Sequence, residues 1–182
     1  MQTALAHDIT MGELLRQFPG AQRALFRKYH IGGCSSCGFS SDETLAGVCA
    51  RNENLPVEGV IDEIMSADAA ERAMQIEPRE LAQRMNSGDR INVLDIRTRE
   101  EFDAVKINSA QFFTQDLMQE ITSNWPREQL LVIYDHTGER ALDAAAWFQG
   151  HGFEQVKVLR GGIDAWSAEV DPKLPRYQLE RA

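Results

Sequence analysis

The hydrophobic pattern of the chain is organised around one segment in its second half. Five apolar residues, Leu130–Tyr134, form a continuous run that is typical of a central parallel strand covered on both faces. Six polar or small residues follow at 135–140, and 141–148 then shows a strong helix pattern. A buried strand that leads through a tight loop into a helix leaves inward-pointing N–H groups without partners. The pattern therefore predicts an anion cradle at residues 135–140.

Shorter strand and helix patterns alternate through the rest of the second half. The strand patterns cover 91–97, 110–113 and 155–159. The helix patterns cover 78–85 and 117–121, and a further helix begins at Arg99. Strands that alternate with helices at short spacing predict an α/β layered fold with a parallel sheet and helices on both faces.

The first 66 residues show helix patterns only. A capping box at Thr10 to Glu13 opens a first helix, residues 21–29 form a second that a glycine ends, Ser41 caps a third, and Pro56 begins a fourth. We therefore predict a small all-α domain at 1–66, a helical tail or linker at 67–75, an α/β domain at 76–177 and a C-terminal tail at 178–182.

Composition and charge narrow the range of functions. The chain has 43% hydrophobic and 26% charged residues, as in a soluble globular protein. Its net charge is −9, and residues 1–70 carry nine acids against five Lys and Arg, so neither half offers a basic face to nucleic acid or to an anionic membrane. We find no membrane-spanning run and no signal peptide, and we expect a cytoplasmic protein.

The three cysteines are Cys34, Cys37 and Cys49. A Cys-x-x-Cys pair in a cytoplasmic chain is more often redox-active or metal-binding than part of a disulfide framework. Cys34 and Cys37 are the good nucleophiles of the chain and form a candidate dithiol, and the alternative is a pair of unreactive loop residues. Cys49 follows the apolar side of its helix, and we expect it in the core.

A metal site is the weaker alternative for the same segment. His30, Cys34, Cys37 and Cys49 offer four nitrogen and sulfur ligands for zinc or an iron–sulfur cluster, but their spacing is not that of a standard zinc module. We therefore expect no cofactor.

Residues 76–177 resemble the rhodanese (sulfurtransferase) family. The resemblance rests on Val93-Leu94-Asp95-Ile96-Arg97 with Glu100-Glu101-Phe102, on the loop with Gly138 and Arg140, and on Leu159-Arg160-Gly161-Gly162-Ile163-Asp164-Ala165-Trp166. In that family a cysteine opens the six-residue loop and carries a persulfide sulfur. This chain has Asp135 there, and a carboxylate cannot hold a sulfane sulfur. Residues 105–110 stand where the family usually has Gly-His-Ile-Pro-Gly-Ala, and four of those six positions differ.

The degenerate loop consists of Asp135, His136, Thr137, Gly138, Glu139 and Arg140. We expect the Asp135 carboxylate to accept the N–H bonds that a persulfide would accept; the alternative is a general acid or base. Arg140 either pairs with Asp135 or points outward toward an anion. We expect an exposed His136, and a supporting ion pair between Asp95 and Arg97 beneath the loop.

The N-terminal segment also has a resemblance. Leu25-Phe26-Arg27-Lys28-Tyr29, the cysteine loop, Thr44-Leu45 and Leu55-Pro56-Val57 resemble the N-terminal helical domain of the di-iron proteins that repair iron–sulfur clusters. They also resemble a domain of unknown function associated with hybrid-cluster proteins. The larger iron-binding domain of the repair proteins has no counterpart in this sequence.

These patterns lead to one expectation for function and two alternatives. We expect a non-catalytic rhodanese-like module with a dithiol loop, which binds a protein partner in sulfur or iron–sulfur metabolism or a small sulfur-containing anion. The first alternative is a sulfurtransferase that uses Cys34 or Cys37 as the persulfide carrier, and the second is a zinc or iron–sulfur protein. The sequence leaves the oligomeric state open.

Overall fold

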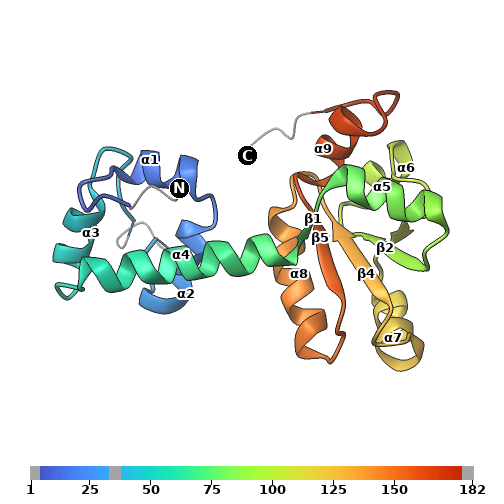
Figure 1. Cartoon of the computed structure of the whole chain (residues 1–182), viewed down its shortest axis with the longest axis horizontal. Helices are drawn as coiled ribbons and strands as arrows, with labels where there is room; N and C mark the ends of the chain where they lie inside the picture. Colours follow the sequence, from blue (N-terminus) through green and yellow to red (C-terminus); the bar gives the residue numbers. More distant parts are fainter. Residues whose placement is uncertain (1–4, 33–37, 178–182) are drawn as a thin grey trace. The chain divides into compact units, whose positions relative to one another are not determined.

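The computed structural model describes residues 5–32 and 38–177. The chain divides into two compact units that meet in sequence between Ala73 and Met74 (Figure 1). The first unit is helical, and the second holds the sheet. We describe each unit by itself.

Four helices build the first unit: α1 (Met11–Gln17), α2 (Ala21–Tyr29), α3 (Leu45–Arg51) and α4 (Val57–Met74). The capping box between Thr10 and Glu13 is present at the start of α1, as predicted. The helices bury a core whose fully enclosed members include Met11, Leu14, Leu25, Leu45, Val48 and Ile64. Helix α4 continues without a break through residues 66–74, and Ala67 on it is buried in this core.

Two of the predicted helix caps in this unit are wrong. Thr44, not Ser41, caps α3, because residues 41–43 form a turn and Thr44 pairs in an antiparallel bridge with Thr10. In that pairing the N–H of Gly12 donates to the carbonyl of Ser41 at 2.9 Å. The C-cap of α2 is His30 in the left-handed region, at φ 59°, where a glycine was expected.

The second unit contains a parallel sheet of five strands in the order β1-β5-β4-β2-β3. The strands are β1 (Gln75–Ile76), β2 (Ile91–Asp95), β3 (Gln111–Phe112), β4 (Leu130–Tyr134) and β5 (Val156–Leu159). Strand β4 has the bounds that its apolar run predicted, and it lies at the centre of the sheet. The predicted α/β class with a parallel sheet is confirmed.

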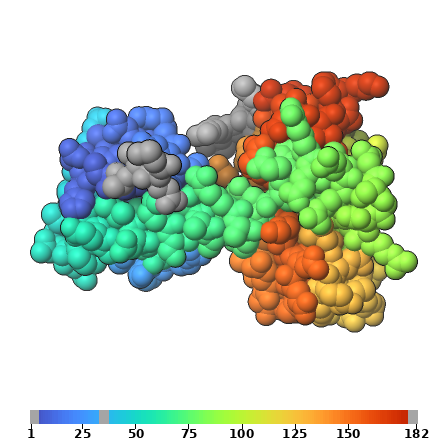
Figure 2. All heavy atoms as spheres, in the orientation of Figure 1, coloured from blue at the N-terminus to red at the C-terminus, as the bar shows by residue number. Residues whose placement is uncertain are grey.

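Five helices accompany the sheet: α5 (Pro78–Ser87), α6 (Arg99–Ala104), α7 (Gln115–Asn124), α8 (Glu139–Gly150) and α9 (Gly162–Glu169). On β4, Leu131 and Ile133 pack in the core shared with α7 and α8. Val132 and Tyr134 pack in the opposite core with α5 and α9. Figure 2 shows α5 in green beside α9 in red on this second face. Both faces of the sheet are therefore covered, which explains the continuous apolar run.

In the part of the chain that the structure describes, no helix combines the length and the apolar character that crossing a membrane requires.

Candidate functional site

The loop at 135–140 closes on its own first side chain. Asp135 follows directly after β4 and is only 3% exposed. Its carboxylate accepts a hydrogen bond from the main-chain N–H of Gly138 and another, at 2.8 Å, from the N–H of Arg140. These N–H groups belong to the loop end and the first turn of α8, where a helix lacks internal acceptors. The cradle for an anion is thus present, and it holds the carboxylate of Asp135.

Two glycines bring the turn after β5 close to this loop. Gly138 has φ +89°, and a Cβ atom there would lie 2.9 Å from the carbonyl oxygen of Leu159. Gly162 has φ +59°, and a Cβ atom there would overlap the carbonyl oxygens of Asp135 and His136. Only glycine permits this approach, which lets the first N–H groups of α9 reach the loop. Ile163 N–H donates to the Asp135 carbonyl at 3.0 Å, and Asp164 N–H donates to the His136 carbonyl at 3.2 Å.

The remaining loop side chains take different positions. Arg140 is exposed, and within the described residues its guanidinium forms no ion pair with Asp135; it contributes through its main-chain N–H. Thr137 and Glu139 are also exposed. The expectation of an exposed His136 is wrong. Its ring is partly buried against the ring of Tyr177, with centroids 4.5 Å apart, because the chain after α9 returns to cover it.

Asp95 and Arg97 form an ion pair in the interior. The two side chains are 0% and 1% exposed, and Arg97 Nη2 lies 2.6 Å from Asp95 Oδ2. Arg97 Nε adds a hydrogen bond of 2.9 Å to Asp95 Oδ1, and the Arg97 main-chain N–H donates to the same oxygen at 3.0 Å. Burial acts to lower the pKa of Arg97, but the hydrogen bonds and the charge of Asp95 outweigh it, so the net shift is upward. Asp95 therefore stabilises the charged form of Arg97.

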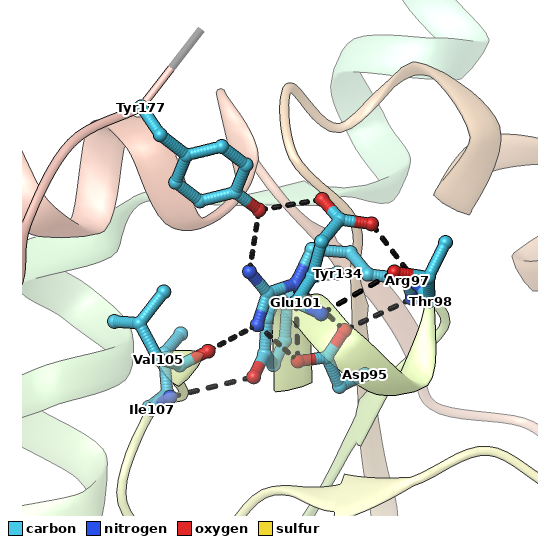
Figure 3. Close-up of polar contacts among 8 residues, drawn as sticks. All are labelled: Asp95, Arg97, Thr98, Glu101, Val105, Ile107, Tyr134 and Tyr177. Atoms are coloured by element: carbon cyan, nitrogen blue, oxygen red, sulfur yellow. Dashed lines mark hydrogen bonds and ion pairs between the residues drawn. The ribbon is translucent and has the colours of Figure 1, made fainter. Parts of the chain in front are cut away.

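The ion pair belongs to a larger polar network that the sequence did not reveal (Figure 3). The Tyr177 hydroxyl accepts a hydrogen bond from Arg97 Nη1 at 2.7 Å and donates one to Glu101 Oε1 at 2.6 Å. Burial and the bond to Glu101 raise the pKa of Tyr177 to about 12. Burial, followed by the charge of Asp95, also raises the pKa of Tyr134. The guanidinium of Arg97 thus joins the end of β2, the main chain at Val105 and the C-terminal segment.

The arrangement of loop, sheet and supporting ion pair can now be compared with known proteins. The family model for the rhodanese-like domain matches residues 77–169, which is more than half of the chain. The chain belongs to the rhodanese-like family. This match begins after the helical first unit.

Several curated relatives carry sulfurtransferase names. This chain is 33% identical over 118 residues to the probable adenylyltransferase/sulfurtransferase MoeZ of Mycobacterium tuberculosis. That alignment covers 63% of this chain and 30% of the relative, so the chain spans less than a third of that protein. The chain is also 32% identical over 93 residues to a sulfurtransferase of Allochromatium vinosum, covering 51% of this chain and 87% of the relative.

Solved structures agree on the fold. Reduced Bacillus anthracis CoADR-RHD has a TM-score of 0.50 at 17% identity, covering 66% of this chain and 21% of that one. The Alr3790 protein from Anabaena has a TM-score of 0.47 at 26% identity, covering 51% of this chain and 85% of that one. The likeness to CoADR-RHD concerns the fold alone.

The segment 105–110 of the rhodanese-like domain, which departs from the family pattern, lies beside the network. The Val105 carbonyl accepts a hydrogen bond from Arg97 Nη2 at 2.6 Å, and the Ile107 N–H donates to the Tyr134 hydroxyl at 3.3 Å. Ser109 has φ +68°, in the left-handed region that favours glycine. The segment is thus fixed through its main chain, and the strained position is one where the family pattern has glycine.

The candidate residues of the first unit are only partly described. Cys34 and Cys37 lie outside the described residues. Cys49 is a free thiol that is 1% exposed, as expected, and burial raises its pKa. His30 is exposed at the end of α2. Among residues 5–32 and 38–177, no three His, Cys, Asp or Glu side chains are grouped so that they could hold a metal ion. Metal binding that includes Cys34 and Cys37 stays a prediction.

Proposed function

We propose that this chain is a non-catalytic rhodanese-like module that acts in sulfur or iron–sulfur metabolism, with the Cys34 and Cys37 pair as its reactive part. One observation carries the proposal. The side chain at the first position of the loop is a carboxylate, and it accepts the N–H bonds of Gly138 and Arg140. The sulfurtransferase names of the curated relatives support the sulfur context.

The chemistry of sulfur transfer explains why Asp135 matters. In transfer from thiosulfate to cyanide, a thiolate attacks the outer sulfur, the sulfur–sulfur bond breaks, and sulfite leaves. The resulting persulfide then gives its outer sulfur to cyanide, which forms thiocyanate and restores the thiolate. A carboxylate has no sulfur atom with which to form the persulfide. Because Asp135 also occupies the loop N–H groups, an external anion meets a negative charge where it needs donors.

The role left to the rhodanese-like domain is binding, and the preferred partner is a protein of the same metabolism. The dithiol assignment rests on the Cys-x-x-Cys spacing and on the absence of another accessible thiol in the described residues, since Cys49 is enclosed in the core. A reduced pair donates two electrons and two protons to an oxidised partner and itself becomes a disulfide.

A sulfurtransferase that uses Cys34 or Cys37 as the carrier is the second candidate. The relatives named as sulfurtransferases favour it. In that case the loop at 135–140 does not take part in the covalent step, and one N-terminal cysteine forms the persulfide.

Thiosulfate:cyanide sulfurtransferase assays separate the two candidates. We expect the purified full chain to show no turnover above a no-enzyme control. Turnover that disappears in Cys34→Ser or Cys37→Ser would establish the second candidate. Turnover that survives both variants and disappears in Asp135→Ala would refute the non-catalytic assignment of the loop.

A further inference from the structure

The chain that follows α9 returns to the loop at 135–140. We name residues 171–177 the C-terminal strap. Its first half is anchored in the domain: Leu174 packs against the core on the α5 and α9 face, and its carbonyl accepts a hydrogen bond from Ser167 Oγ at 2.5 Å. The Leu174 N–H donates to the Asp171 carbonyl at 3.0 Å.

The second half of the strap also packs against this core, through Tyr177, but its hydrogen bonds differ from those of the first half. Within the described residues, 175–177 make all their hydrogen bonds to the domain through side chains. The Arg176 guanidinium binds the Asp164 carboxylate at 2.8 and 2.7 Å, on the surface. The Tyr177 hydroxyl bridges Arg97 and Glu101 (Figure 3). A segment held by side chains alone, with an exposed ion pair, opens at a lower free energy than the whole domain.

Tyr177 covers the parts of the site that a partner of the loop would meet. Its ring lies on the ring of His136, and its hydroxyl takes an N–H of Arg97. Among the residues that the structure describes, the buried His136 Nδ1 atom has no hydrogen-bond partner, a state that costs free energy relative to contact with water. Opening of 175–177 alone would restore that contact and would leave Leu174 in place.

We propose that the C-terminal strap is an autoinhibitory cover, which shields His136 of the 135–140 loop while Tyr177 is seated and exposes it when residues 175–177 are released. This proposal rests on the partner-binding role given to the loop above. The strap then sets how often the loop is available to a partner.

The seat of Tyr177 also indicates what displaces it. It offers a guanidinium N–H of Arg97, a carboxylate oxygen of Glu101 and the face of His136. A small sulfur anion would meet the negative charges of Glu101 and of Asp135 close by. A tyrosine side chain has the three required features: a flat ring, a hydrogen-bond acceptor for Arg97 and a donor for Glu101. The displacing partner is therefore a protein segment that presents a tyrosine.

Carbethoxylation of histidines, followed by peptide mass spectrometry, measures the opening. His7, His30 and His151 are exposed and serve as references in the same sample. We expect Tyr177→Ala to speed the modification of His136 relative to these references by about tenfold, because the tilted contact between the two rings and both hydrogen bonds of the Tyr177 hydroxyl are lost. Arg176→Ala should speed it less, and Lys173→Ala, an exposed strap residue, is the matched control that leaves the rate unchanged.

Amide hydrogen exchange in β4 establishes that each variant is folded. An unchanged His136 rate in folded Tyr177→Ala overturns the proposal. If Tyr177→Ala does not fold, the same measurement is made on Tyr177→Phe, which keeps the ring and loses both hydrogen bonds of the hydroxyl. An unchanged rate of His136 modification in Tyr177→Phe also overturns the proposal.

N-acetyltyrosinamide tests the partner assignment on folded Tyr177→Ala. We expect millimolar N-acetyltyrosinamide to slow His136 modification again and N-acetylphenylalaninamide to slow it less. Equal effects of the two compounds overturn the assignment of a tyrosine. Sulfurtransferase turnover would overturn the proposed function without changing the His136 rates, so the two failures are distinguishable.

Discussion

The Asp135 carboxylate accepts the N–H of Arg140 at 2.8 Å, from a residue five positions further along the chain. The loop that would surround a bound anion therefore surrounds a side chain of its own. This relationship links the stability of the domain to the side chain that occupies the loop N–H groups.

Replacement of Asp135 by asparagine tests the structural half of that link. Asp135→Asn keeps the size of the side chain but removes its charge. One carboxylate oxygen, which accepts a loop N–H, becomes an amide nitrogen, which is itself a donor. We expect a loss of about 1–3 kcal/mol in the free energy of unfolding. All three tryptophans, Trp125, Trp147 and Trp166, lie in the second unit, so their fluorescence during urea unfolding follows this domain.

Asp143→Asn is the matched control for that variant. Asp143 is exposed on α8, and we expect its replacement to change the free energy of unfolding by less than about 0.5 kcal/mol. Equal effects of the two substitutions would show that the carboxylate of Asp135 does not hold the loop.

Ser109→Gly should stabilise the domain. Ser109 has φ +68°, where a Cβ atom is strained, and glycine removes the strain at some cost in unfolded-chain entropy. We expect a net gain of about 1 kcal/mol in the same urea experiment. Ser109→Ala keeps the Cβ atom and should give no gain. A gain of the same size in both variants would exclude backbone strain as the cause.

Local patterns in the sequence predicted much of the fold. Strand β4 and helix α2 have the predicted bounds, because the apolar run and the helical spacing are set by neighbouring residues. The capping box at Thr10 is local in the same sense. Where the chain met a distant partner, the prediction failed. The cap of α3 is Thr44 and not Ser41, because residues 41–43 form a turn that brings Thr44 into a bridge with Thr10.

In the candidate site, too, the features that are local in sequence were predicted and the long-range contacts were not. The loop at 135–140 follows from a strand, a short polar segment and a helix, all contiguous in sequence. The Tyr177 contacts with Arg97 and His136 join residues that are 80 and 41 positions apart, and no periodicity marks such pairs. The expectation of an exposed His136 failed for this reason. A tyrosine after the last helix is only a weak sequence signal for a residue that covers the loop, since the contact depends on where the chain turns back.

Alkaline titration tests the contacts of Tyr177. Its pKa rises from 10.0 to about 12 in the folded protein, so the folded state holds the proton more tightly than the unfolded state. This stabilisation is complete below pH 10 and is lost as the pH rises toward 12. We expect the wild type to lose stability more steeply than Tyr177→Phe over that interval, in urea unfolding at fixed ionic strength. Parallel profiles would show that the Tyr177 hydroxyl is not buried between Arg97 and Glu101.

Thiol labelling tests the assignment of the three cysteines. Cys49 is buried, and burial raises its pKa, so a thiol reagent should reach it only after unfolding. We expect the thiols of Cys34 and Cys37 to react with the reagent in the native protein. On mild oxidation we expect both free thiols to disappear together. Preferential loss of Cys49 would refute the dithiol assignment. Anaerobic reconstitution with iron and sulfide, followed by visible absorption, distinguishes the cluster alternative.

Titration of the folded chain with thiosulfate or sulfate, followed by the NMR signals of the Gly138 and Arg140 amides, tests the central claim most directly. In the wild type we predict no saturable shift of these signals, because the Asp135 carboxylate already accepts both N–H groups. In Asp135→Ala, which removes the carboxylate and leaves the N–H donors, we predict a saturable shift at the same two amides. A saturable shift of both amides in the wild-type protein would show that an external anion enters the loop beside Asp135, and would contradict the account.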